Sequence, residues 1–301
     1  MNRRTFGQAI AGAALGAALP LVEFAQTPVA GAASFGLSVM LWTVFKNLPF
    51  EERLAKVAEA GYSKIELVGE YKNWSAAEFE RANAARKRLG IEFDATAGLR
   101  NGVADPGTRD AFLAELKQGL TPMETLGCPA MIVLSGNLVA TLSREAQHQA
   151  SVETLKRAAS LVEGKTIAGQ PVRLLLECIH LEENPKYFLT SANEAIEIVR
   201  AVNHPQVQFL YDIFHEQMSY GNLIDKLDKH IDVIGLIHVA DVPGRHEPGT
   251  GEIDYGNIFR KLDKLKYRHN VAMEFLPVGD QVSALRDARH FAERATMAAV
   301  V

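Results

Sequence analysis

Four ionisable residues follow apolar runs in the second half of the sequence, at points where buried strands are expected to end. Glu177 comes after three leucines, and three further residues stand in similar surroundings: Asp212, His238 and Glu274. A charge buried there without a partner would cost several kcal/mol. Successive members are 35, 26 and 36 residues apart, which is about one strand and one helix each. The spacing therefore predicts that the four lie side by side on consecutive strands.

This set of side chains predicts a divalent metal site. Three carboxylates and one imidazole brought together would repel one another unless a cation lay among them. An oxygen-rich set with a single imidazole suits one Mn²⁺ or Mg²⁺ ion, with Co²⁺ as a further candidate. The two cysteines form no CxxC pair, so a thiolate zinc motif of that type is excluded. The alternative for each residue is a salt-bridged or supporting role at the same place.

The elements that must position these residues follow an alternating pattern. Short apolar runs alternate with longer stretches of helical period, which predicts parallel strand–helix units. The predicted strands are Phe35–Trp42, Lys64–Val68, Ile91–Ala97, Ala130–Leu134, Val172–His180, Val207–His215, Val233–Ala240 and Val271–Leu276. The predicted helices cover about residues 50–60, 75–89, 106–127, 143–164, 191–202, 221–229, 255–266 and 281–298. Eight pairs match an α/β fold, the single-domain (β/α)8 TIM barrel. A doubly wound sheet is disfavoured because no glycine-rich turn follows the first strand.

Two further residues fall near the predicted site. Catalytic groups of such barrels lie at the C-terminal ends of the strands, so all four residues above belong to one rim. His215, three residues after Asp212, points to the same rim and could hydrogen-bond a substrate oxygen; the alternative is a structural histidine. Arg245, in the loop after the seventh strand, could form a bidentate pair with a substrate carboxylate. The alternative for Arg245 is a solvated loop charge.

The first 32 residues have the pattern of an export signal. Arg3 and Arg4 precede an uncharged Ala- and Gly-rich run, and small residues end at Ala32. This pattern is typical of a twin-arginine signal, with an apolar helix or membrane anchor as the alternative. We therefore expect cleavage after residue 32, a barrel domain over residues 33–301, the twin-arginine export machinery as a partner, and a periplasmic or exported location. The formal net charge of −4 argues against a nucleic-acid partner.

Several motifs in the second half resemble a known family. They are Leu-Leu-Glu177-Cys-Ile-His180, Tyr-Asp212-Ile-Phe-His215, Ile-His238-Val-Ala-Asp241, Glu247-Pro-Gly-Thr-Gly-Glu252-Ile-Asp254-Tyr255 and Glu274-Phe-Leu-Pro. The sequence is similar to the hydroxypyruvate isomerase branch of the xylose-isomerase-like barrels. The resemblance implies one metal held by Glu177, Asp212, His238 and Glu274, with Glu177 and Glu274 doubling as an acid–base pair. It also implies that barrels of this kind associate into homo-oligomers.

Two of the chain's departures from that branch fall at predicted site residues. His238 stands where the branch tends to have Gln, and His180 stands where an Asn is usual, so that His180 joins the predicted substrate-binding residues. These differences do not change the predicted metal or reaction class, but the identity of the substrate stays undetermined.

The implied reaction is a metal-dependent isomerisation of a small hydroxy-carbonyl compound. It requires removal of a proton next to a carbonyl, formation of an enediolate, and return of a proton by a carboxyl group. Hydroxypyruvate, converted to tartronate semialdehyde, and related keto-sugars are the expected substrates. The alternatives are a ketose 3-epimerase, an inosose-dehydratase-like lyase and an exported, non-catalytic sugar-binding barrel. A DNA-acting enzyme of the endonuclease IV type would need additional early histidines, and the first histidine is His148.

Overall fold

The computed structural model describes residues 33–297, and the predicted export signal lies outside them. Eight parallel strands close into a barrel in the order β1-β10-β9-β8-β7-β4-β3-β2. They are β1 (Gly36–Met40), β2 (Lys64–Leu67), β3 (Glu92–Thr96), β4 (Ala130–Leu134), β7 (Arg173–Glu177), β8 (Val207–Asp212), β9 (Ile234–Val239) and β10 (Asn270–Met273). All eight overlap the predicted strands, which confirms the single-domain TIM barrel.

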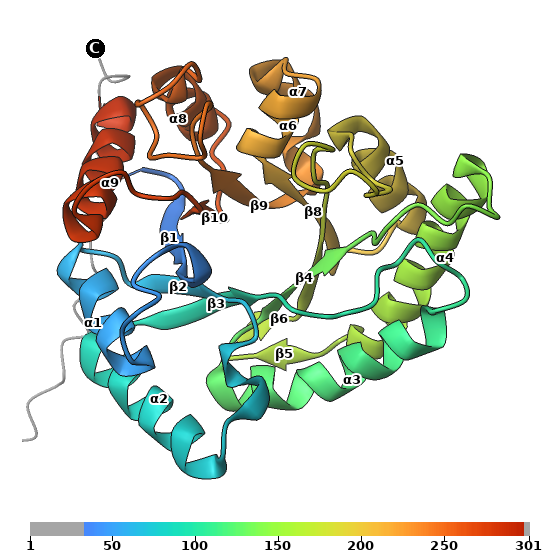
Figure 1. The fold of residues 1–301 in the computed structure, drawn as a ribbon, viewed down its shortest axis with the longest axis horizontal. Coiled ribbons are helices and arrows are strands. Elements are labelled where there is room, and N and C mark those ends of the chain that lie inside the picture. The colour runs from blue at the N-terminus through green and yellow to red at the C-terminus, as the bar shows by residue number, and fades with distance from the viewer. Residues whose placement is uncertain (1–32, 298–301) are drawn as a thin grey trace, which may run out of the picture. The chain divides into compact units, whose positions relative to one another are not determined.

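Helices form a ring around the strands (Figure 1). They are α1 (Phe50–Glu59), α2 (Ala76–Leu89), α3 (Arg109–Leu126), α4 (Arg144–Val162), α5 (Ala192–Val202), α6 (Ile213–Ser219), α7 (Leu223–His230), α8 (Tyr255–Lys264) and α9 (Gln281–Met297). Three short 3-10 helices, Leu41–Thr43, Glu70–Asn73 and Ile231–Val233, and a hairpin of β5 (Thr166–Ile167) and β6 (Gln170–Pro171) complete the described chain. Within residues 33–297, no helix combines the length and apolar character needed to cross a bilayer.

Strand alternation places the four ionisable residues inside the barrel. The interior is filled by a layer of apolar side chains that includes Leu175, Leu210, Leu236 and Ala272. Successive side chains of a strand point to opposite faces, so the residue two positions later points inward again. Those positions are Glu177, Asp212, His238 and Glu274. The side chains on the outer face pack instead against the surrounding helices in the larger core.

The predicted strand Val207–His215 is three residues too long. Strand β8 ends at Asp212, and α6 begins at the next residue. The Asp212 carboxylate accepts a hydrogen bond from the backbone N–H of His215 at 3.1 Å and so caps the N-terminus of α6. His215 therefore lies in the first turn of a helix rather than on a strand, and it remains beside Asp212 at the rim.

Candidate active site

Four buried side chains converge at the C-terminal end of the barrel. Their ligand atoms all lie within 4.8 Å of one another, and they belong to Glu177, Asp212, His238 and Glu274. Glu177 and Asp212 end β7 and β8, His238 lies in β9, and Glu274 directly follows β10. Their strands are adjacent, with His238 in register with Asp212 on one side and Ala272 on the other. The structure thus brings together the four residues for which the sequence predicted a metal site.

Glu274 is the most heavily hydrogen-bonded of the four. One of its oxygens, Oε2, lies 2.8 Å from His238 Nδ1 and 2.8 Å from Arg245 Nη2. The other oxygen, Oε1, accepts a hydrogen bond from Trp42 Nε1 at 2.7 Å. Both oxygens therefore face donors, which holds this carboxylate in one orientation.

The carboxyl groups have pKa values that are pushed in opposite directions. Burial raises the pKa of Glu177 well above its usual value, and the nearby Glu274 charge raises it further. Burial also raises the pKa of Asp212, to about 6. Burial opposes ionisation of Glu274 as well, but Arg245 and His238 outweigh it and hold the pKa of Glu274 far below its usual value. Without a bound cation, the surroundings therefore favour the protonated form of Glu177 and the ionised form of Glu274.

The donor set fits a divalent cation. Asp212 Oδ2 is buried and makes no hydrogen bond with any group of residues 33–297, which is costly for a carboxylate oxygen. Arg245 Nη2 lies 3.6 Å from that oxygen, so one guanidinium compensates several carboxylates only in part. Three carboxylate oxygens and one imidazole nitrogen at this separation could complete the charge balance by binding a metal ion.

The predicted substrate-binding residues line the same site. Arg245 is buried rather than solvated, 7% exposed, with its guanidinium over the rings of Trp42 and Phe214. Its Nη1 lies 2.7 Å from Glu183 Oε2, and the Glu183 side chain is 43% exposed. The alternative of a solvated loop charge is therefore wrong for Arg245.

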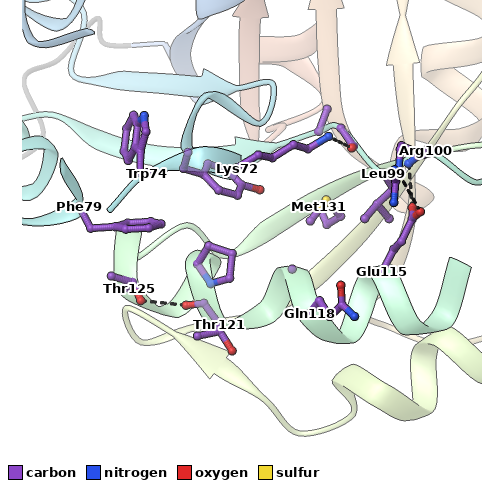
Figure 2. A pocket seen from close by; sticks show the side chains of 15 residues that line it. Lys72, Trp74, Phe79, Leu99, Arg100, Glu115, Gln118, Thr121, Thr125 and Met131 are labelled. Carbon is purple, nitrogen blue, oxygen red and sulfur yellow. Dashed lines mark hydrogen bonds and ion pairs between the residues drawn. The ribbon is translucent and has the colours of Figure 1, made fainter. Parts of the chain in front are cut away.

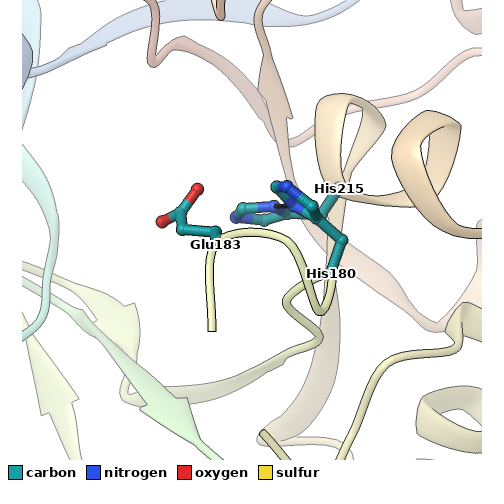
Figure 3. A group of neighbouring side chains, drawn as sticks. All are labelled: His180, Glu183 and His215. Atoms are coloured by element: carbon teal, nitrogen blue, oxygen red, sulfur yellow. Dashed lines mark hydrogen bonds between the residues drawn. The ribbon is translucent and has the colours of Figure 1, made fainter. Parts of the chain in front are cut away.

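His180 and His215 form a buried pair. Their Nδ1 atoms are 2.7 Å apart, and Figure 3 shows their rings side by side near Glu183. His215 Nε2 faces the site, 3.4 Å from Asp212 Oδ2 and 3.9 Å from Glu177 Oε1. Burial lowers the pKa of His215 to about 3, and Arg245 lowers it further, so that this ring is neutral at physiological pH.

Three residues of the site were missed by the sequence reasoning. Trp42 contacts Glu274 across 232 residues of sequence, and Glu183 lies in a loop, so no spacing pattern marks either of them. Glu66, which contacts His238, did carry a usable signal. It is a carboxylate between two apolar residues, Ile65 and Leu67, within the predicted strand Lys64–Val68.

A hollow of about 540 Å³ lies away from these residues (Figure 2). It is bordered by α2, α3 and the segment after β3, and Trp74 and Phe79 contribute its aromatic wall. Its two nearby cationic side chains are already engaged, Lys72 with the carbonyl oxygen of Gly98 and Arg100 with Glu115. The hollow contains none of the predicted site residues.

Comparison with known proteins places the chain among isomerases. A family model described as xylose isomerase-like TIM barrel matches residues 54–294. A putative hydroxypyruvate isomerase of Mus musculus is 32% identical over 83% of this chain and 93% of its own length. A 2-oxo-tetronate isomerase of Pectobacterium atrosepticum is 28% identical over 83% of this chain and 95% of its own. Among solved structures, a protein described as an AP endonuclease of family 2 from Brucella melitensis has a TM-score of 0.74 and 26% identity, and covers 84% of this chain and 96% of that one.

Proposed function

The chain belongs to the xylose isomerase-like TIM barrel family, and from that premise we propose that it is a divalent-metal-dependent isomerase of a small hydroxy-carbonyl compound. It is an isomerase by its relatedness to the curated isomerases. Hydroxypyruvate, or a related 2-oxo acid or keto-sugar, is the substrate that we propose. The observation that carries the proposal is the convergence of Glu177 and Glu274, two buried carboxyl groups that meet Asp212 and His238 with ligand atoms within 4.8 Å of one another.

The proposed cation would be held by the four residues of the converging set, Glu177, Asp212, His238 and Glu274. When bound, a divalent ion such as Mn²⁺ or Mg²⁺ supplies a Lewis acid for the oxygens of the substrate. The buried Asp212 Oδ2, which accepts no hydrogen bond from residues 33–297, supports this assignment. The charge of the carboxylates is then balanced by the ion together with Arg245.

The two glutamates would carry the proton transfers. Glu274, which is ionised, takes the proton from the carbon next to the carbonyl, and the C–H electron pair becomes the C=C bond of an enediolate. Glu177 passes a proton taken from solvent to the former carbonyl carbon. A hydroxyl proton passes from one substrate oxygen to the other, and the carbonyl has moved by one carbon. Glu177 and Glu274 then exchange protons with solvent to restore their starting states.

His215 would donate a hydrogen bond to the reacting oxygens. Two carboxylates face its Nε2, so the favoured neutral tautomer carries the hydrogen there. The Nδ1 atom then accepts a hydrogen bond, and the donor is Nδ1–H of His180 at 2.7 Å. His180 thus fixes the tautomer of His215, which explains why a second histidine can occupy this position.

The contacts of Arg245 favour a substrate that carries a carboxylate. Its partner Glu183 is the only strongly exposed one of the three carboxylates that pair with it, the others being Asp212 and Glu274. An incoming carboxylate can therefore take the place of Glu183 at Nη1, while the inner side of the guanidinium stays with the buried carboxylates. A 2-oxo acid such as hydroxypyruvate offers this carboxylate, whereas a neutral ketose does not.

The experiment is a substrate panel with residues 33–301. Hydroxypyruvate, 2-oxo-tetronate, C4–C6 ketoses and inosose are each incubated with Mn²⁺ or with a chelator, and the products are identified by NMR. We expect isomerisation of a 2-oxo acid in Mn²⁺ and a loss of that activity in the chelator. An epimer or a dehydrated product would assign one of the alternative reactions, and equal activity in the chelator would refute the proposed metal dependence.

A further inference from the structure

Glu66 lies inside the barrel directly behind His238. Its side chain comes from β2, on the opposite side of the barrel from the converging set, and it is fully buried. Its Oε2 atom is 2.8 Å from His238 Nε2. On the other edge of the same ring, Nδ1 lies 2.8 Å from Glu274 Oε2. The imidazole is thus held between a carboxylate of the site and one that stands outside it.

We propose that Glu66 is a positioning residue for metal binding: it accepts a hydrogen bond from Nε2–H of His238 and so directs the Nδ1 lone pair into the metal site. This inference rests on the metal site of the proposed function. A neutral imidazole has one donor and one acceptor, and the hydrogen bond at one nitrogen determines which of them is free to bind a metal. Nδ1 of His238 lies 2.8 Å from Glu274 Oε2, so a bound metal ion would displace any hydrogen from Nδ1, and His238 is then a ligand while Nε2 keeps its hydrogen.

Among residues 33–297, His238 is the only hydrogen-bond partner of the Glu66 side chain. Its other oxygen, Oε1, is buried and has no hydrogen-bond partner among residues 33–297. The next buried carboxylate in the barrel, Asp94 on β3, has separate partners, Ser38 and Asn270. A buried carboxylate with one hydrogen bond is costly, and the single contact that compensates Glu66 is the one to His238. Carboxylates that support a histidine ligand in this way raise its basicity and fix its orientation.

The test measures Mn²⁺ affinity and needs no substrate. Free Mn²⁺ is followed by electron paramagnetic resonance during titration of wild type, Glu66→Gln, Glu66→Met and the matched control Asp94→Asn, which removes a buried charge from the same barrel without touching His238. Gln keeps a neutral acceptor, so we expect a loss of affinity of about 10-fold; Met removes the acceptor, and we expect about 100-fold. The control is expected to bind within about twofold of wild type.

The outcomes separate the inference from the proposed function. If wild type binds no Mn²⁺, the proposed function fails. If wild type binds but both Glu66 variants bind within twofold of it, or if Asp94→Asn loses as much affinity as Glu66→Gln, the inference is overturned. Circular dichroism monitors folding, and if Glu66→Met does not fold, the comparison of Glu66→Gln with Asp94→Asn decides alone. Saturating Mn²⁺ should restore turnover in Glu66→Gln, since a positioning residue acts through the metal ligand and not on the substrate.

Discussion

Glu274→Gln tests the acid–base pair through a change of a few atoms. The substitution removes the negative charge and replaces one carboxylate oxygen by an NH2 group. In the structure both oxygens face donors, Trp42 Nε1 on one side and Arg245 Nη2 on the other. Whichever way the amide is turned, its NH2 group meets a buried donor.

The magnitude follows from these contacts. A buried donor left without an acceptor costs about 1–3 kcal/mol, so we expect a loss of unfolding free energy in that range. Turnover should fall by about 10²- to 10⁴-fold, because the variant has lost its general base. Turnover is measured in saturating Mn²⁺ on the substrate found active, and stability is measured by thermal unfolding. Trp42→Phe is the control, since it removes one hydrogen bond to Glu274 and leaves its charge. Turnover by Glu274→Gln within tenfold of wild type would refute the two-carboxylate mechanism.

Three further predictions concern the histidine pair, the pH dependence and the N-terminal segment. His180→Asn keeps an N–H donor and should retain turnover, whereas His180→Leu should lose roughly tenfold, the value of one hydrogen bond; equal turnover of the two variants would contradict the tautomer assignment. In chelator, the thermal stability should fall as the pH rises from about 4 to about 6. The pKa of Asp212 is about 6 in the folded chain and about 4 in the unfolded chain, so over this range only the folded chain holds the proton, and raising the pH removes it. Mn²⁺ should reduce this fall, and a fall of unchanged size in Mn²⁺ would count against Asp212 as a ligand. Replacing Arg3 and Arg4 with Lys should keep the protein in the cytoplasm on cell fractionation, and unchanged export would exclude a twin-arginine signal.

The site residues from the second half of the chain were predictable because each places an ionisable side chain in or directly after an apolar run. Glu177 follows three leucines at the end of β7. Asp212, His238 and Glu274 likewise lie in or directly after mostly apolar strands, so strand alternation points them inward. Arg245 was found from its place after a strand, but its burial depends on the rings of Trp42 and Phe214, which only the closed barrel brings together.

The missed features have physical causes as well. The apolar residues Ile213 and Phe214 extend the pattern of β8, and only the capping contact between Asp212 and the backbone of His215 shows that a helix begins there. The link between Glu66 and His238 spans 172 residues, so barrel closure rather than local sequence creates it.

The most direct test of the central claim is isomerisation in D₂O with Mn²⁺ present. If Glu274 takes a proton from one carbon and Glu177 donates another, the donated proton comes from solvent in each turnover. We therefore predict about one carbon-bound deuterium per product molecule, counted by NMR or mass spectrometry. A product formed without carbon-bound deuterium would show direct hydrogen transfer between the two carbons and would contradict the proton transfer assigned to Glu177 and Glu274.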